Sequence, residues 1–490
     1  MKFQPTFESL REYECPDWFR DAKFGIWSHW GPQSVPMYGD WYARNMYREG
    51  EPQYLCHLRN YGHPSEFGYK DLCKLWKAEN FNPDELMELY HKAGARYFVA
   101  QAMHHDNFFN YATKLNRFNS VEIGPMKDIC ELWQSAAKKY SMPFGLTEHL
   151  SAAFTWWNTN KRSDKSGPYK GVPYDGNDPE YKDLYFDNAE LANMEYDAFA
   201  PKDYEGDFLN WYADNQEFHE YWLKVMDELI EKFEPDLLYS DGGIPFGHPD
   251  STNDFENYKT GLETISKLYN KSIEKHGKNR AVYNQKDRRE EVYTVGVLDI
   301  ERSQLPDILP HPWQTDTCTG VWFYDVRQEY KKPGHIVEIL VDIISKNGNL
   351  LLNVLQRPDG TLDFETKYIL EELAKWFAVC SDGVYATRPW KVSGEGKTKV
   401  FIDGFTEDKT EWDSSDYRFT AKGDKVYAFM LKAPENGVAI LTSFMDENVK
   451  SVRLLGVGEV PFSQKFGLLT VQLPKILPTE YTNCLEITLD

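Results

Sequence analysis

The sequence predicts an irregular (β/α)8 barrel, similar to a TIM barrel, followed by a C-terminal antiparallel β-sandwich. Three observations lead to this fold class. Eight short apolar runs end in polar residues, amphipathic segments separate several of them, and after residue 390 the pattern changes to short alternating runs between turns. Buried strands that alternate with helices indicate a parallel sheet, and eight of them suggest a closed barrel. We therefore expect a barrel domain at residues 1–388 and a sandwich domain at residues 389–490.

The expected barrel strands are eight apolar runs. They cover residues 24–30, 97–106, 144–150, 237–243, 281–287, 295–301, 313–320 and 350–356. The runs that begin at 281, 295 and 313 lie close together, which leaves little room for full helices between them. We therefore expect that part of the barrel to be irregular.

Amphipathic segments mark the clearest helices, at residues 82–95, 126–140, 216–233 and 335–348. Asn82 is expected to cap the first of these helices at its N-terminus. Gly348 is expected to cap the last one at its C-terminus. The stretch from 160 to 215 is rich in Lys, Asp, Gly, Pro and Tyr, and we interpret it as a long insertion that covers the pocket.

The composition limits the possible partners. A formal net charge of −22 repels polyanions, so we expect neither nucleic acid nor an acidic membrane as a partner. Aromatic residues make up 15% of the chain, and they either pack against the C–H faces of sugars or form a large aromatic core. The seven cysteines include no CxxC pair, which argues against a zinc site and against a dense disulfide framework.

The sequence leaves the compartment open. It has no apolar stretch of the length that spans a membrane, and its N-terminus has no apolar core of signal-peptide length. We expect a periplasmic or secreted protein if a leader has been removed, and a cytoplasmic protein otherwise. No oligomeric state follows from the sequence.

Polar residues follow the apolar core of the expected strands. In a barrel, the carboxyl ends of the strands form the face where catalysis takes place. One polar residue at such a position needs no function, but a set of them at one face is harder to attribute to turns. The set contains His29, His104, His105, Asp106, Glu148, His149, Asp241, Asn284, Glu301, Thr315, Asp316 and Asn353.

Two carboxylates are the main candidates for chemistry. Asp241 ends the run PDLLYSDGG, where two glycines leave space around it, although an Asp-Gly pair also favours a tight turn. Glu301 ends another strand, although it could instead pair with Arg302. If two acids face each other across the barrel mouth, their separation decides between a retaining and an inverting glycosidase. The rivals of Glu301 for the second role are Glu290, Glu291 and Asp299.

The histidines form the third element of the candidate site. Adjacent residues on a strand point to opposite sides, so His104 and His105 do not easily bind one metal ion together, although a kinked strand end could aim both inward. Neutral imidazoles are good hydrogen-bond partners for sugar hydroxyls. His29 would supply another polar contact and Trp41 an aromatic wall.

Six sequence blocks carry a more specific signal. They are WFRDAKFGIWSHWGPQSVPMYGDWYARNMY, HKAGARYFVAQAMHHDNFF, PDLLYSDGG, PWQTDTCTGVWFYD, HIVEILVDIISKNGNLLLNVLQRPDGTL and GVYATRPW. They spread over roughly residues 18–390, and in this order they resemble the blocks of glycoside hydrolase family 29, the α-L-fucosidases. Such a collinear set is highly specific.

The resemblance implies a (β/α)8-like catalytic domain, a C-terminal β-sandwich, and retaining release of terminal α-L-fucose from an oligosaccharide. It implies that Asp241 is the nucleophile, and that no metal or other cofactor is needed. Glu301 is our choice for the acid/base, because of its spacing after Asp241 and its position at a strand end, and we expect a raised pKa to keep it protonated. The positions that match sugar-binding or pocket-lining residues of the family are His29, Asp40 (where Glu is usual), Trp41, His104, His105, Trp313 and Trp322.

Three short segments depart from the family pattern. Residues 147–149 read TEH where YYS is usual, Met103 and Asn107 flank the histidine block where Lys and Gly are usual, and NVLQ replaces NVGP. Glu148 and His149 therefore alter one wall of the pocket and are further candidates for substrate contact. L-Galactose is L-fucose with a hydroxyl on C6, so one polar partner near C6 could admit it.

Three alternatives stay open at this point. Within the family, the chain could be an α-L-galactosidase. Outside it, the chain could be a catalytically silent carbohydrate-binding protein, or a metal-dependent barrel hydrolase with His104 and His105 as ligands.

Overall fold

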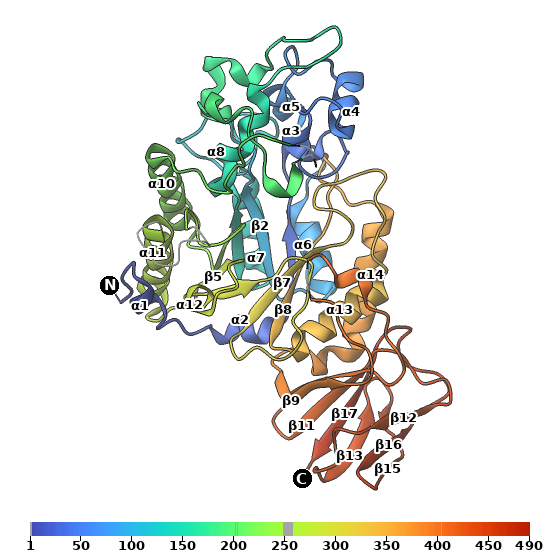
Figure 1. The fold of residues 1–490 in the computed structure, drawn as a ribbon. Helices are drawn as coiled ribbons and strands as arrows, with labels where there is room; N and C mark the ends of the chain where they lie inside the picture. The colour runs from blue at the N-terminus through green and yellow to red at the C-terminus, as the bar shows by residue number, and fades with distance from the viewer. Residues whose placement is uncertain (1, 201, 203, 248–257, 403) are drawn as a thin grey trace.

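The computed structural model describes residues 2–200, 202, 204–247, 258–402 and 404–490. Its centre is a closed barrel of eight parallel strands in the order β1 to β8, of which Figure 1 labels β2, β5, β7 and β8. Each strand overlaps one of the predicted apolar runs, and the predicted fold class is confirmed. The strands are β1 (Phe24–Ser28), β2 (Tyr97–Met103), β3 (Phe144–Glu148), β4 (Leu237–Ser240), β5 (Val282–Gln285), β6 (Val297–Asp299), β7 (Trp313–Cys318) and β8 (Gly348–Asn353).

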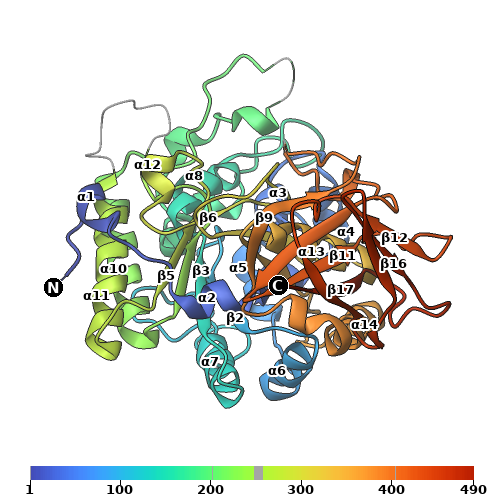
Figure 2. The same ribbon diagram turned by 90° about the horizontal axis from the view of Figure 1, so that it is seen from below.

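Helices pack outside this ring, and Figure 2 shows α6, α7, α10 and α11 around it. The four predicted helices are present, and Asn82 caps the first by accepting from the N–H of Glu85. Two further long helices, α11 and α14, were not predicted. The bounds are α6 (Pro83–Lys92), α7 (Ile129–Lys139), α10 (Gln216–Phe233), α11 (Lys259–His276), α13 (Pro333–Ser345) and α14 (Phe364–Cys380).

The predicted C-cap role of Gly348 is wrong. Helix α13 ends at Ser345, and Gly348 is the first residue of β8. A Cβ at this position would lie 2.6 Å from the side chain of Ile343 and 2.7 Å from the ring of Trp313, so the glycine is needed where helix and strand approach closely.

The barrel is irregular where the sequence leaves little room for helices. Only the short helix α12 (Glu290–Tyr293) connects β5 to β6, and residues 300–312, which are all described, contain no helix between β6 and β7. The strand ends in this sector are therefore close in the chain as well as in space.

Short helices lie above the ring in Figure 1, on the side away from the sandwich. They come from the segments after β1 and after β3, and the second segment includes the predicted insertion at residues 160–215. They are α3 (Tyr42–Asn45), α4 (Pro52–Asn60), α5 (Tyr69–Leu75), α8 (Ala153–Trp156) and α9 (Lys182–Tyr185), and two further short helices, α1 (Phe7–Leu10) and α2 (Asp17–Ala22), precede β1.

The C-terminal part forms two antiparallel sheets with the strand orders β14-β13-β17-β11-β10-β9 and β12-β16-β15. A separate apolar core that includes Phe419, Phe444 and Leu485 fills it, and α13 packs against β9 and β10. The exact division at residue 388/389 stays a prediction. The bounds are β9 (Arg388–Glu395), β10 (Tyr417–Lys422), β11 (Lys425–Met430), β12 (Val438–Leu441), β13 (Val449–Leu454), β14 (Gly458–Glu459), β15 (Phe462–Lys465), β16 (Leu468–Gln472) and β17 (Asn483–Leu489).

Two whole-chain features complete the description. None of the helices in the described ranges combines the length and the apolar character that crossing a bilayer requires. All seven cysteines are free thiols, and five of them are buried.

The barrel interior is filled by side chains, which makes it a packed core. Gly25 on β1 lies opposite Tyr97 on β2, and the buried Tyr97 ring crosses the interior so that its hydroxyl donates to Gln314 at 2.8 Å. A Cβ at Gly25 would lie 2.4 Å from that ring. The ring therefore occupies the space that the glycine leaves.

We expect Gly25→Ala to destabilise the protein by about 1–3 kcal/mol, because the added methyl group overpacks a buried ring that cannot move away. Thermal denaturation measures this cost. Gly243→Ala is the matched control, because a Cβ there would meet nothing closer than 3.6 Å. An equal stability loss in the two variants would contradict the packing argument.

Candidate active site

A pocket of about 740 Å³ opens at the carboxyl ends of the barrel strands. Its size lies within the range of about 300–1,000 Å³ that is usual for small-molecule sites. Nine residues singled out from the sequence line it: His29, Asp40, Trp41, His104, His149, Asp241, Glu301, Asp316 and Trp322. The other lining residues are Trp27, Asn45, Arg48, Glu51, Phe199, Trp211, Gly242, Lys286, Arg302, Val321 and Phe405.

Asp241 enters the pocket directly after β4. Its backbone N–H donates to the carbonyl of Glu148 at 3.1 Å, which ties it to the end of β3. Gly242 follows with φ +115°, and a Cβ there would lie 2.6 Å from the hydroxyl of Tyr212. Only glycine suits this backbone and this space, so the glycine is what allows the strand end to present the acid to the pocket.

Lys286 is the centre of the charged side of the pocket. It follows β5, and its Nζ lies 2.8 Å from Oδ1 of Asp241 and 2.6 Å from Oε2 of Glu301. The same Nζ is 3.7 Å from Asp316 on β7. Lys286 is not among the residues singled out from the sequence, although it lies at the end of the predicted strand 281–287. A lysine gives no signal of its own function until the carboxylates around it are known.

The charges in this cluster stabilise one another. Burial would raise the pKa of Asp241, but the ammonium of Lys286 and the hydrogen bond from His105 outweigh burial and hold that pKa well below its usual range. Burial would lower the pKa of Lys286, but Asp241, Asp316 and Glu301 together raise it well above its usual range. Asp241 is therefore a carboxylate and Lys286 an ammonium.

Glu301 is the only one of the four candidate second acids that lines the pocket. Besides Lys286, its carboxylate accepts from Nε1 of Trp322 at 3.2 Å. Asp299 is buried beneath the pocket, where it accepts from Gln314 at 2.7 Å, and burial raises its pKa well above the usual range. The other two candidates, Glu290 and Glu291, are exposed on the first turn of α12.

Asp316 adds a third carboxyl group beside Lys286. Burial raises the pKa of Asp316 to about 6, and its Oδ2 accepts from the hydroxyl of Tyr239 at 3.0 Å. The same hydroxyl lies 3.3 Å from Asp241, so Tyr239 links the two acids below the pocket floor.

Histidines form the opposite, neutral side of the pocket. Burial lowers the pKa of His29 and His104 well below the usual range and that of His149 to about 3, so all three rings are uncharged at neutral pH. Both ring nitrogens of His29 and Nδ1 of His149 have no hydrogen-bond partner among the described residues. Buried polar atoms normally have partners, so these nitrogens are suited to a polar ligand.

The same three histidines could hold a metal ion. One ring nitrogen from each of His29, His104 and His149 lies within 4.8 Å of the others. His105, which the sequence analysis paired with His104, is not part of this group. Its Nε2 lies 3.3 Å from Oδ2 of Asp241, and its Nδ1 lies 2.6 Å from the carbonyl of His149. It therefore contacts the carboxylate and does not line the open pocket.

Asp40 and Trp41 border the pocket from the loop before α3. Burial raises the pKa of Asp40 to about 7. Trp41 has the left-handed backbone conformation at φ 54°, which is uncommon for a bulky residue and concentrates at functional sites. Its ring stacks at 6.2 Å on Trp211, which the insertion after β3 supplies.

Besides His105, two of the residues predicted to contact the substrate do not line the pocket. Glu148 ends β3 fully buried and accepts from Nε1 of Trp222 at 3.0 Å and from the N–H of Ser151 at 3.1 Å. Trp313 is the first residue of β7, at the opposite end of the barrel, and its Nε1 donates to the carbonyl of Lys346 at 2.8 Å. The prediction that Glu148 and Trp313 contact the substrate is therefore not supported by their positions. Both side chains instead make hydrogen bonds in the protein core.

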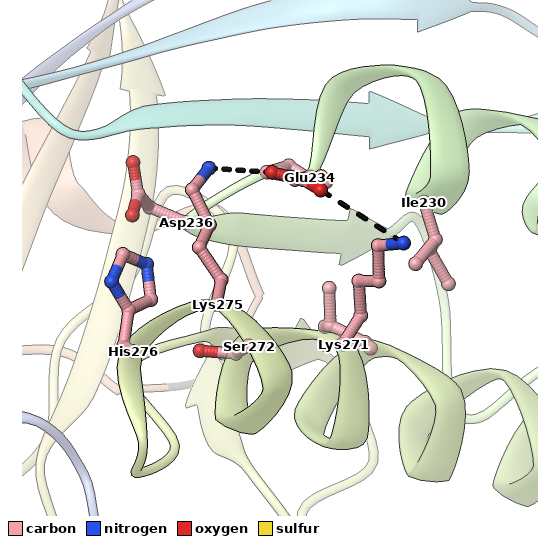
Figure 3. A pocket seen from close by; sticks show the side chains of 9 residues that line it. Ile230, Glu234, Asp236, Lys271, Ser272, Lys275 and His276 are labelled. Atoms are coloured by element: carbon pink, nitrogen blue, oxygen red, sulfur yellow. Dashed lines mark ion pairs between the residues drawn. The ribbon is translucent and has the colours of Figure 1, made fainter.

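A second depression lies far from this site, where α10 and α11 meet the start of β4. Figure 3 shows Lys271 and Lys275 reaching Glu234 across it, at 3.9 Å and 2.9 Å. Its volume of about 10 Å³ suffices for one water molecule at most. It does not compete with the large pocket as a substrate site.

Comparisons with known proteins agree with this architecture. The family described as Alpha-L-fucosidase matches residues 1–382, and the one described as Alpha-L-fucosidase C-terminal domain matches residues 395–488. Tissue alpha-L-fucosidase of Homo sapiens is 27% identical over 99% of this chain and 92% of its own length. The crystal structure of Thermotoga maritima alpha-fucosidase in complex with fucose is similar at a TM-score of 0.72, with 25% identity over 99% of this chain and 100% of that one.

We expect Lys286→Met to destabilise the protein by about 3–5 kcal/mol at pH 7, because it leaves buried carboxylates without their counter-ion. Since the folded pKa of Asp241 is depressed, its contribution to stability is present above the unfolded value of about 3.9 and is lost as the pH falls. The loss in the variant should therefore stay nearly constant from pH 7 to about pH 5 and shrink as the pH falls below about 4, which thermal denaturation at several pH values measures.

Lys286→Arg is the control for this effect, because it keeps the positive charge. It should retain most of the stability at pH 7. A stability difference between Lys286→Met and the parent that does not change with pH would contradict the electrostatic account.

Proposed function

The chain belongs to the alpha-L-fucosidase family and is a glycoside hydrolase, and from this premise we propose that it releases terminal α-L-fucose from oligosaccharides or glycoconjugates by double displacement. Asp241 is the proposed nucleophile and Glu301 the proposed acid/base. The observation that carries this proposal is the shared contact of both carboxylates with the ammonium of Lys286.

This shared contact limits the distance between the two acids. Their nearest oxygens cannot be further apart than the sum of the two contacts to Nζ, about 5.4 Å. Retaining glycosidases have carboxyl groups about 5–5.5 Å apart, whereas inverting enzymes need about 6.5–9.5 Å to admit a water molecule. The geometry therefore supports a retaining mechanism over an inverting one.

In the first half-reaction, the Asp241 carboxylate attacks the anomeric carbon while the bond to the leaving oxygen breaks. Glu301 gives its proton to that oxygen, and the aglycone departs. In the second half-reaction, Glu301 takes a proton from water, the resulting hydroxide forms a bond to the anomeric carbon, and Asp241 leaves as a carboxylate. Fucose is released and both acids return to their starting states.

Lys286 is positioned to stabilise the negative charge that moves between Asp241 and Glu301 during these two half-reactions. During the first half-reaction the negative charge passes from Asp241, which becomes an ester, to Glu301, which loses its proton. Because Nζ contacts both groups, one ammonium stabilises the charge at either position without a large movement. Trp322 also donates to Glu301, which keeps that carboxylate oriented toward the pocket.

The neutral side of the pocket would hold the sugar. His29, His104 and His149 offer ring nitrogens to hydroxyl groups, and Asp40 adds an acceptor. Trp27, Trp41 and Trp322 supply aromatic faces for the C–H groups. None of these proposed contacts requires the histidines to bind a metal.

We expect Asp241→Asn to abolish turnover of 4-nitrophenyl α-L-fucoside without loss of the fold, because the amide cannot form the glycosyl ester. Glu301→Ala should be slow on substrates with poor leaving groups, and azide should restore its rate on an activated fucoside. Steady-state kinetics with and without azide measures both effects. A near-normal rate in Asp241→Asn would exclude the nucleophile assignment, and absence of azide rescue would exclude Glu301.

The alternative within the family is an α-L-galactosidase. His149 favours it, because this residue lines the pocket and its Nδ1 has no partner among the described residues. Glu148, the other candidate partner for a C6 hydroxyl, is held by Trp222 outside the pocket.

We expect kcat/KM to be higher on 4-nitrophenyl α-L-fucoside than on the α-L-galactoside, since the four tryptophans that line the pocket offer apolar surface for the C6 methyl group of fucose. Side-by-side rates on the two glycosides measure this preference. A faster rate on the galactoside would support the alternative, and in that case His149→Phe should lower the galactoside rate more than the fucoside rate.

A further inference from the structure

Two phenylalanines at the outer rim of the pocket have no role in the proposed mechanism. Phe199 and Phe405 line the pocket, yet 48% of the first and 61% of the second is exposed. They come from distant parts of the chain, Phe199 from the insertion after β3 and Phe405 from the segment between β9 and β10. A large apolar surface at the mouth of a binding pocket indicates a further ligand contact.

The segment that carries Phe405 is bound to the barrel beside Glu301. The N–H of Thr406 donates to the carbonyl of Arg302 at 3.1 Å, and Nε of Arg302 donates to Glu407 at 2.9 Å. Glu407 is buried and also pairs with Lys331 at 3.0 Å. Phe405 is therefore held in place next to the proposed acid/base, although it follows the last strand of the barrel by about fifty residues.

Phe199 continues the aromatic wall of the pocket outward. Its ring lies 5.0 Å from that of Trp41, which in turn stacks on Trp211. The wall thus runs from the tryptophans inside the pocket to the exposed ring of Phe199 at the rim. A ligand that extends from the inner pocket would meet this ring next.

The leaving group of a glycoside must pass Glu301, because the acid has to reach the scissile oxygen. The next residue in the chain, Arg302, has its guanidinium carbon 5.6 Å from the centre of the Phe405 ring. A leaving group bound beside Glu301 would therefore also lie close to this rim. The pocket volume of about 740 Å³ leaves room beyond a single monosaccharide, since pockets of this size hold drug-sized ligands.

We propose that Phe199 and Phe405 form a leaving-group subsite, which binds the pyranose residue attached to fucose through its C–H face. This inference rests on the proposed function and specifies its substrate class as fucosylated oligosaccharides with a pyranose next to the scissile bond. A neutral sugar fits the rim, because its charged neighbours are paired with each other: Arg48 lies 3.7 Å from Glu51, and Arg302 pairs with Glu407. Their remaining N–H groups can bind sugar hydroxyls.

The test compares substrates with and without that pyranose. The parent enzyme is first assayed on α-1,2-, α-1,3-, α-1,4- and α-1,6-linked fucosyl disaccharides, and the best one is kept. Phe199→Ala and Phe405→Ala should each lower kcat/KM on this disaccharide about tenfold, as expected for the loss of one apolar contact. On α-L-fucosyl fluoride, whose leaving group is a single ion, both variants should stay within about twofold of the parent.

Matched controls lie on the same segments. Phe208 and Phe401 are 51% and 52% exposed and do not line the pocket, so Phe208→Ala and Phe401→Ala should leave both rates unchanged. The proposal is overturned if the rim variants lose no more on the disaccharide than these controls do. It is also overturned if they lose equally on the fluoride, because that result indicates damage to the inner site.

A binding measurement separates this proposal from the proposed function. In the Asp241→Asn background, calorimetric titration with the disaccharide should show about tenfold weaker binding after Phe405→Ala, while the affinity for free fucose stays the same. A parent enzyme that hydrolyses neither disaccharide nor fluoride would refute the proposed function. Even then, the titration would test whether Phe405 contributes to a leaving-group subsite. Equal affinity for the disaccharide with and without Phe405→Ala would refute the subsite proposal.

Discussion

Closure of the barrel between β1 and β8 is the constraint on which the rest of the site depends. Because all eight strands are parallel, closure brings their carboxyl ends to one face. Asp241, Lys286 and Glu301 follow three consecutive strands, and the β4–β5 and β5–β6 pairings place them side by side. Gly242 allows the chain to turn directly after Asp241. Among the described residues of this sector, only the short helix α12 lies between β5 and β6, and no helix lies between β6 and β7, so the connections are short. The charged cluster is therefore a direct result of strand order.

The pocket has two chemically different sides, and burial acts on them in opposite ways. On one side, burial alone would neutralise the carboxylate of Asp241, but an ammonium within 2.8 Å keeps it charged. On the other side, no acid among the described residues pairs directly with His29 or His104, and burial outweighs the influence of Asp241, so the imidazoles remain neutral. His105 connects the two sides, because its ring contacts Asp241 and the carbonyl of His149. Such a site combines a charged reaction centre with neutral hydrogen-bonding groups, as a neutral sugar requires.

The rim of the pocket is assembled from parts of the chain that do not belong to the strand ring. The insertion after β3 supplies Trp211 and Phe199, and the segment after β9 supplies Phe405. The buried Glu407 fixes the second of these segments, since it compensates the charges of Arg302 and Lys331. The charged centre of the pocket thus depends on the ends of the barrel strands, whereas its aromatic wall and entrance also depend on the insertion after β3 and on the connection to the sandwich sheets.

The sequence by itself determined the fold class, the eight strands, the long helices 82–95, 126–140, 216–233 and 335–348, and the family. Alternating apolar runs and amphipathic segments are local signals, and a set of polar residues at the carboxyl ends of barrel strands indicates the functional face. For the same reason the sequence led to Asp241, Glu301, His29 and His104, all of which lie in the pocket.

Only the tertiary structure decided which of the remaining candidates meet there. Strands of a barrel are buried on both faces, so their apolar pattern does not tell which side chains reach the pocket. Trp313 begins its strand at the far end of the barrel, and Glu148 turns toward Trp222 instead of the pocket. Lys286 and Phe405 acquire their positions from contacts with residues that are distant in the chain, such as Asp241 and Arg302. Contacts of this kind have no local sequence pattern, because they exist only once the strands and loops have been brought together.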